Sequence, residues 1–83
     1  MRLRYFAAVR EGIGLGEEEV AVPGDVATVA DLVAWLRTRG PRYDFALGEG
    51  SGVRVALDRV HAKPEKPIAG TAEAALFPPM TGG

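Results

Sequence analysis

Cysteine is absent from the 83 residues of this chain, and histidine occurs once, as His61. The chain can therefore form neither a disulfide framework nor a thiolate metal site, and a single histidine cannot assemble a histidine-based one. We expect no bound metal and no other bound cofactor. Because no nucleophile–base pair is apparent either, we predict that the chain is not an enzyme on its own.

An excess of charge and a long apolar run are missing as well. The chain has ten Lys and Arg residues and 11 Asp and Glu residues, for a net charge of -1. This balance gives no electrostatic reason to bind a phosphate backbone. No apolar run approaches the ~20 residues that cross a bilayer, and residues 1–5 carry charges where a signal peptide is apolar. We expect a cytoplasmic protein with no nucleic-acid or membrane partner.

The residues that are present suit one small domain with a thin core. The hydrophobic fraction is 47%, and period-2 alternation predicts strands over 2–7, 17–23, 53–57 and 72–77, with a short edge strand over 60–62. The first two of these strands enclose a glycine-rich stretch, which predicts a hairpin. Residues 42–47 are expected to form a turn or a short 3₁₀ segment.

One amphipathic helix is predicted after the hairpin. Thr28 is a candidate N-cap with Asp31 three residues later, a weaker relative of the capping box. Gly40-Pro41 is expected to end the helix. Its apolar stripe is formed by Val29, Leu32, Val33 and Leu36.

The element order β-β-α-β-(β)-β predicts a two-layer α+β domain, with one amphipathic helix on a mixed sheet of four to five strands. This order is compatible with the β-grasp (ubiquitin-like) fold, although the pattern alone leaves other small α+β sheets open. We assign residues 1–77 to this domain and residues 78–83 to an extended, flexible C-terminal tail.

The tail starts with Pro78-Pro79 and ends with Gly82-Gly83. Prolines cannot donate to a sheet ladder and favour an extended backbone, so the tail should leave the sheet as an arm. At about 3.3 Å per residue, its six residues would reach roughly 20 Å. The glycines lack a Cβ, so the arm could enter a narrow channel in a partner and present the carboxylate of Gly83. A terminal diglycine also arises by chance in a frayed end, but the preceding prolines favour a function.

A terminal carboxylate needs activation before it can carry an acyl or sulfur group. Attack on the α-phosphate of ATP would give an acyl adenylate, from which a sulfur donor could displace AMP. The product is a C-terminal thiocarboxylate, a good sulfur nucleophile. In this scheme the chain is a substrate and carrier.

Both ends of the chain carry a family resemblance. Residues 5–11 (Tyr-Phe-Ala-Ala-Val-Arg-Glu), followed by Gly14, resemble the first strand and turn of the MoaD/ThiS family of ubiquitin-like sulfur carriers. Residues 76–83 (Leu-Phe-Pro-Pro-Met-Thr-Gly-Gly) resemble the Phe-Pro-Pro-x-x-Gly-Gly ending of the family's molybdopterin synthase small subunits. The spacing between these segments also fits, so the resemblance covers essentially the whole chain.

The resemblance implies a β-grasp fold and a sulfur-carrier function in molybdenum cofactor biosynthesis. An E1-like adenylating enzyme would use ATP to activate Gly83, and a sulfur donor protein would supply the sulfur of the thiocarboxylate. The loaded carrier would join the large subunit of molybdopterin synthase in a heterotetramer, where the large subunit carries the catalysis. There the carrier would donate sulfur for the dithiolene of molybdopterin.

A docking surface is expected on the face of the sheet that the helix leaves uncovered. Phe6 and Phe77 lie on that face by strand alternation, and adjacent first and last strands would bring the two rings together. The predicted reactive end is Gly82 and Gly83. The predicted partner-binding residues are Phe6, His61, Phe77, Pro78, Pro79, Met80 and Thr81.

One loop and two single residues depart from the family pattern. The loop over residues 69–73 lacks the common Asp-Gly-Asp-Glu, which puts its turn contacts in doubt. Asp58 stands where Asn is common, and His61 stands where relatives place an apolar partner-facing residue.

Two other functions stay open. A carrier for thiamin synthesis or tRNA thiolation would use the same tail with a different sulfur acceptor. A ubiquitin-like protein modifier would instead be conjugated to target lysines through Gly83.

Overall fold

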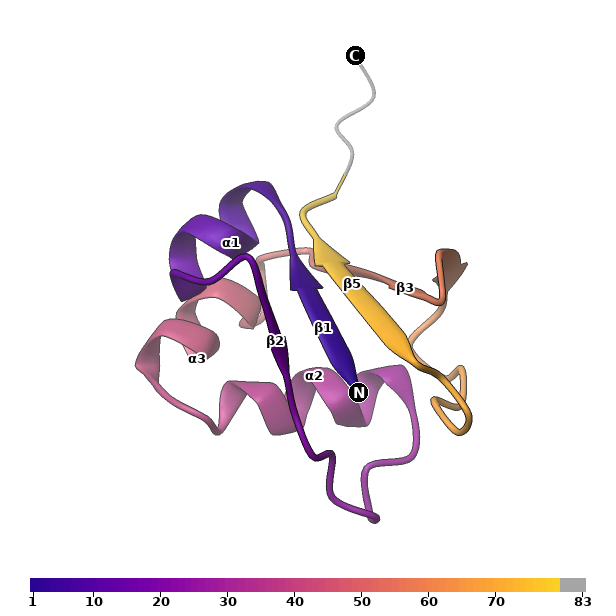
Figure 1. Ribbon diagram of the computed structural model, residues 1–83. Helices are drawn as coiled ribbons and strands as arrows, with labels where there is room; N and C mark the ends of the chain where they lie inside the picture. Colours follow the sequence, from indigo (N-terminus) through magenta and orange to yellow (C-terminus); the bar gives the residue numbers. More distant parts are fainter. Residues whose placement is uncertain (80–83) are drawn as a thin grey trace.

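The computed structural model describes residues 1–79, in which five strands and three helices follow one another (Figure 1). The strands are β1 (Arg2–Tyr5), β2 (Glu17–Glu19), β3 (Arg54–Leu57), β4 (Val60–Ala62) and β5 (Glu73–Phe77). The helices are α1 (Ala7–Ile13), α2 (Val29–Arg37) and α3 (Pro41–Leu47).

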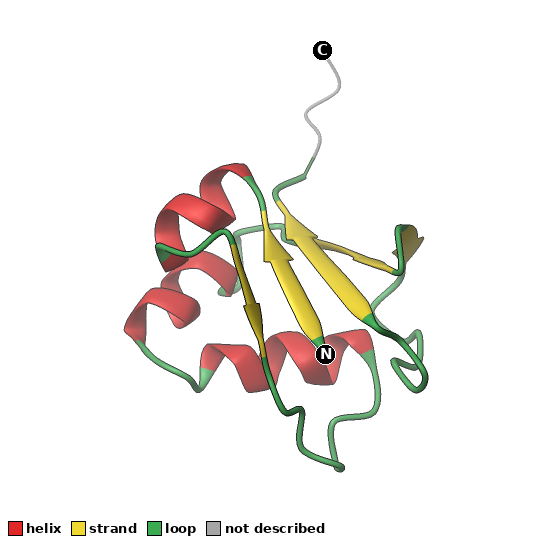
Figure 2. Ribbon diagram, in the orientation of Figure 1, coloured by secondary structure: helices red, strands yellow, loops and turns green. Residues whose placement is uncertain are grey.

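The five strands form one mixed sheet in the order β2-β1-β5-β3-β4. The first and last strands, β1 and β5, are parallel neighbours at its centre (Figure 2), and the remaining pairs are antiparallel. Since β1 and β5 run in the same direction, the chain leaves β5 at the end of the sheet where it leaves β1. The predicted adjacency of these strands is confirmed.

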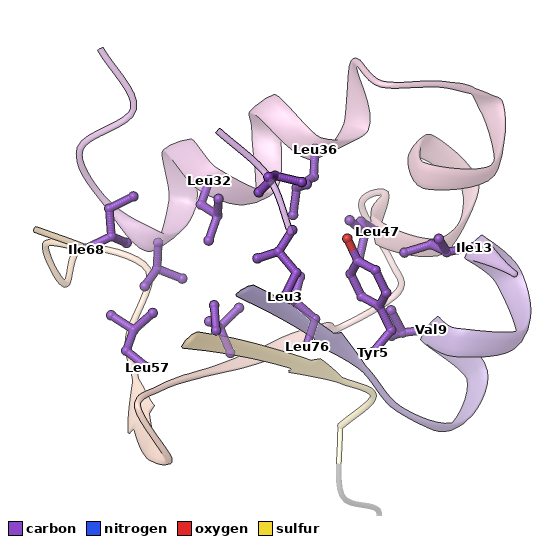
Figure 3. Packing of buried hydrophobic residues seen from close by; sticks show 14 residues of the cluster. Leu3, Tyr5, Val9, Ile13, Leu32, Leu36, Leu47, Leu57, Ile68 and Leu76 are labelled. Atoms are coloured by element: carbon purple, nitrogen blue, oxygen red, sulfur yellow. The ribbon is translucent and has the colours of Figure 1, made fainter. Parts of the chain in front are cut away.

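All three helices pack on one face of the sheet. The core holds Leu3 and Leu76 from the central strands and Leu32 and Leu36 from α2, each with no exposed surface. Figure 3 shows these side chains between the sheet and α2, with residues of α1 and α3 at one end of the cluster. This two-layer arrangement, with its mixed sheet, is the β-grasp fold.

The capping of α2 matches its prediction and is stronger than expected. The Thr28 side chain accepts a hydrogen bond from the Asp31 backbone N–H at 3.2 Å, and the Asp31 carboxylate accepts one from the Thr28 N–H at 3.2 Å. The reciprocal pair makes a full capping box with aspartate in place of glutamate. The Asp31 carboxylate also accepts from the Ala27 N–H, and the two backbone hydrogen bonds that it accepts lower the pKa of its carboxyl.

The antiparallel pairing predicted for the first two strands is confirmed, but the predicted glycine-rich loop between them is wrong, because the connection from β1 to β2 contains the helix α1. The first strand stops at Tyr5, and Ala7 turns the chain with a φ of 51°. Val9 and Ile13, four residues apart, then face the core. Gly14 ends the helix in the left-handed conformation, with its N–H donating to the Arg10 carbonyl.

Residues 41–47 form helix α3, so the predicted turn and the single-helix layer are both wrong. Pro41 occupies the first position of this helix, where a missing N–H is tolerated. Helix α2 already ends at Arg37, and Gly40-Pro41 therefore starts α3 instead of stopping α2. Leu47 is the residue of α3 that enters the core.

Candidate functional site

The last strand delivers Phe77 and the start of the tail to one end of the sheet. Alternation along β5 buries Ala74 and Leu76 and leaves Ala75 and Phe77 half-buried on the opposite face. The ring of Phe77 lies 5.6 Å from that of His61, centroid to centroid, at an interplanar angle of 41°. The exposed His61 comes from edge strand β4, so the pair spans three strands of the sheet.

Phe6 follows β1 directly and is 41% exposed. Its backbone N–H donates to the Leu76 carbonyl at 3.1 Å, which fixes it beside the end of β5. The Arg4 guanidinium lies 5.5 Å from the centre of the Phe6 ring. The predicted pairing of Phe6 with Phe77 is wrong, because among the aromatic side chains of residues 1–79 the partner of Phe77 is His61.

The tail begins against the body of the protein. Pro78 and Pro79 are half-buried, and the Pro79 ring lies next to Gly52 in the loop before β3. Gly52 has a φ of +66°, a conformation that suits glycine, and its missing side chain leaves the room that Pro79 uses. The structure thus brings together Phe77, His61 and Pro79 near the end of β5. The predicted site residues Met80, Thr81, Gly82 and Gly83 lie outside the described residues.

The turn that joins β3 to β4 is fastened to the start of β5. Asp58 and Arg59 both have positive φ, as a two-residue hairpin turn requires. The Asp58 carboxylate accepts hydrogen bonds from the backbone N–H groups of Ala72 at 3.1 Å and Glu73 at 2.9 Å. Asp58 therefore holds the end of the loop over residues 69–73, and β5 starts in a fixed register.

A polar cluster that the sequence analysis missed ties β2 to the helical layer. One carboxylate oxygen of Glu18 accepts hydrogen bonds from the hydroxyls of Tyr5 and Tyr43, both at 2.7 Å. Its other oxygen lies 3.0 Å from the guanidinium of Arg39. The sequence reads as a solvated acidic strand here, but the Glu18 side chain is only 15% exposed. The inward position of Tyr5 was the available signal, because a buried hydroxyl requires a partner.

The ionisation of this cluster follows from its contacts. Burial works to raise the pKa of Glu18, but hydrogen bonds from Tyr43, Tyr5 and Arg39 outweigh it and lower that pKa. Burial, together with the hydrogen bond to Glu18, raises the pKa of Tyr5 far above its ordinary value and that of Tyr43 in the same direction. Glu18 is therefore a charged acceptor at neutral pH, and both tyrosines are neutral donors.

No group of three or more potential metal ligands occurs within residues 1–79. In the same part of the chain, no helix is long and apolar enough to cross a membrane.

These features define a small ubiquitin-like protein whose last strand presents its C-terminal segment beside an aromatic surface. The family model described as the ThiS family matches residues 3–83. The chain belongs to this family.

Two relatives and one solved structure match almost from end to end. The chain is 32% identical to the molybdopterin synthase sulfur carrier subunit of Escherichia coli (strain K12), over 100% of this chain and 99% of the relative. It is 30% identical to the protein of the same name from Haemophilus influenzae, with the same coverage. The crystal structure of small archaeal modifier protein 1 from Haloferax volcanii superposes with a TM-score of 0.74 at 27% identity, over 96% of this chain and 97% of that one.

Proposed function

We propose that this chain is the sulfur-carrier subunit of a molybdopterin synthase and that Gly83 carries the sulfur as a thiocarboxylate. The observation that supports this most is the match to the E. coli sulfur carrier subunit along 99% of that protein, together with the Pro-Pro and Gly-Gly pairs of the tail. The chain contributes its terminus and its docking surface, and the large subunit contributes the catalytic groups.

The loading reaction takes place in two steps on the partner enzyme. The Gly83 carboxylate attacks the α-phosphate of ATP, which forms a mixed anhydride with AMP and releases pyrophosphate. A sulfur donor protein then supplies a persulfide sulfur that attacks the glycyl carbonyl carbon. The C–O bond to AMP breaks, AMP leaves with the electron pair, and an acyl disulfide joins the donor to Gly83. A second thiol of the partner proteins then attacks the donor sulfur, so that the S–S bond breaks, a disulfide forms between the two thiol sulfurs and the thiocarboxylate leaves with the electron pair.

The described part of the chain supports this function as a docking and positioning body. Phe77 and His61 provide an aromatic surface of the kind found in interface cores. Pro78 and Pro79 follow directly, so a partner that contacts Phe77 is placed beside the start of the tail. Both the adenylating enzyme and the large subunit are expected to use this surface, which makes their binding mutually exclusive.

A second function, protein modification, is favoured by one specific observation. The similarity to small archaeal modifier protein 1 covers nearly the whole chain with a TM-score of 0.74. The activated Gly83 adenylate is common to both functions. They differ in the acceptor, which is a sulfur atom for the carrier and a lysine amine for the modifier.

The test is the intact mass of the protein purified from its own cells under mild, non-reducing conditions. The proposal expects replacement of one oxygen by sulfur, located at Gly83 by fragmentation, and copurification of a larger subunit. Isopeptide-linked adducts without any thiocarboxylate would favour the modifier instead. A plain carboxylate, even after incubation with an adenylating enzyme, ATP and sulfide, would contradict both functions.

A further inference from the structure

A groove of about 520 Å³ lies on the helical side of the sheet, between α2 and strands β3 and β4. The loop that joins α3 to β3 closes one side. Val33, Val53 and Ala62 line it, and each is partly buried against the core with the remainder of its surface accessible. The groove stays open because small residues border it, among them Ala34 of α2 and Gly50 of the loop.

The charges along the groove are mostly positive. Arg37, Arg54 and Lys63 line it, against one acidic residue, Glu49. Arg37 is already paired with Asp44 at 2.8 Å. Neither Arg54 nor Lys63 has an ion-pair partner within residues 1–79. An occupant with negative charge would therefore meet two exposed cations beside an apolar floor.

One wall of the groove is also an edge of the sheet. Strand β4 is last in the strand order, so its outer backbone groups have no strand partner in the part of the chain that the structure describes. An extended peptide can add to such an edge through main-chain hydrogen bonds. Alternate side chains of the added strand would then face the groove, on the same side as Ala62.

The opposite edge of the sheet has its charges already paired. Strand β2 carries the exposed Glu17 and Glu19, which form ion pairs with the N-terminal amine, Arg2 and Arg4 at 2.9 to 3.9 Å. The cations beside β2 are thus already engaged by carboxylates, whereas the two exposed cations of the groove are not engaged within residues 1–79. An acidic peptide is therefore expected to prefer the β4 edge.

We propose that the groove between α2 and β4 is a binding site for an extended acidic peptide of a partner protein, with alternating aliphatic and acidic residues. The apolar floor of the groove lies on the helical face of the sheet, and its rim includes His61, whose ring lies 5.6 Å from that of Phe77. The groove therefore adjoins the aromatic surface at β4. This inference does not depend on the sulfur chemistry of Gly83.

The test titrates the full ¹⁵N-labelled chain with an acetylated, amidated six-residue peptide of alternating valine and aspartate. A peptide of alternating valine and lysine serves as the charge-reversed ligand. The acidic peptide is expected to shift the backbone amides of Val33, Ala34, Ser51, Ala62 and Lys63, whereas the basic peptide leaves them in place. No shift with the acidic peptide at millimolar concentration, or shifts centred on Phe77 or β2, would overturn the proposal.

Variants make the site assignment specific. Lys63→Glu is expected to weaken binding about fivefold or more, as loss and reversal of a rim charge does. Lys66→Glu makes the same change on an exposed lysine outside the groove and should leave the affinity unchanged. Ala34→Leu should block binding by filling the groove while the thermal midpoint stays within a few degrees. Equal effects of the two lysine variants would contradict the proposal.

One further outcome identifies a different occupant. If the acidic peptide binds a chain that ends at Pro79 but not the full chain, the C-terminal segment competes for the groove. That result would replace a partner peptide by the chain's own residues 80–83 and would overturn the proposal as stated.

Discussion

Pro79 is packed against Gly52 so closely that a Cβ added to Gly52 would lie 3.1 Å from the Cγ of Pro79. The contact holds the second proline of the tail against the loop before β3. It also makes the loop before β3 part of the functional end of the molecule. The glycine is required here both by its φ of +66° and by the space that its neighbour takes.

Gly52→Ala is expected to destabilise the fold and to move the start of the tail. A left-handed alanine costs about 1–2 kcal/mol, and the clash with Pro79 adds to that strain. Urea unfolding measures the stability, and the amide shifts of Phe77 and of neighbouring tail residues report the displacement.

Gly50→Ala is the matched control, because Gly50 has a φ of +89° but a Cβ added to it would meet no heavy atom within 4 Å beyond its chain neighbours. This variant should lose stability through backbone strain but leave the amide chemical shift of Phe77 unchanged. Identical shifts in the two variants would show that Pro79 does not depend on the contact with Gly52.

The strands and the capped helix could be predicted from the sequence because their signals are local. Alternation buries Leu3 and Tyr5 in β1 and Ala74 and Leu76 in β5, as expected from the pattern. Thr28 with its aspartate three residues later marked the start of α2 correctly. In each case the deciding residues lie within a few positions of one another.

The helices α1 and α3 were missed because each is only seven residues long. Such a helix has little intrinsic stability, and its formation depends on packing against the rest of the core. In the sequence alone, Val9 and Ile13 fit a loop after the first strand as well as they fit a helix. Their contacts with the core decide for the helix. The ring pair of His61 and Phe77 is equally non-local, since it depends on the β4–β3–β5 strand order.

Phe77→Asp is expected to weaken binding of both proposed partners, the adenylating enzyme and the synthase large subunit, at least about tenfold, as removal of a central aromatic contact does. A charge placed beside His61 would be desolvated in either complex. Isothermal titration calorimetry with each partner measures the change.

Phe45→Asp makes the same substitution in α3, where Phe45 is 85% exposed. This variant should bind both partners with unchanged affinity. If Phe77→Asp bound them as tightly as the wild type, the aromatic surface would have no part in docking.

Glu18→Gln is expected to lower stability at neutral pH by about 1–3 kcal/mol, since it removes a charged acceptor from hydrogen bonds with two tyrosines. The pKa of Glu18 in the folded chain lies below its ordinary value of 4.5. Its contribution is therefore fully present above that value and is lost as the pH falls through the lower folded pKa. The wild type should lose stability on acidification more steeply than the variant.

Urea unfolding at pH 7 and at several values below about pH 5 measures how the free energy of unfolding changes with pH in the wild type and in Glu18→Gln. Glu17→Gln, at an exposed position of the same strand, should leave the neutral-pH stability almost unchanged. Parallel pH profiles for the wild type and Glu18→Gln would show that Glu18 does not titrate in this range.

Deletion of Gly83, or replacement of Gly82 by valine, is expected to leave folding intact and to abolish loading of the terminus. The buried core residues of the described part of the chain lie between Leu3 and Leu76, before both positions. Intact mass after incubation with an adenylating enzyme, ATP and sulfide measures the loading, and urea unfolding measures the stability of the fold.

Gly82→Ala is the graded control, because it adds only one methyl group. This variant should load more slowly than the wild type but faster than the valine variant, since a larger side chain fits less well in a narrow channel of the partner. Loss of the fold in any of these variants would contradict the separation of body and tail, and full loading of the valine variant would contradict a narrow channel.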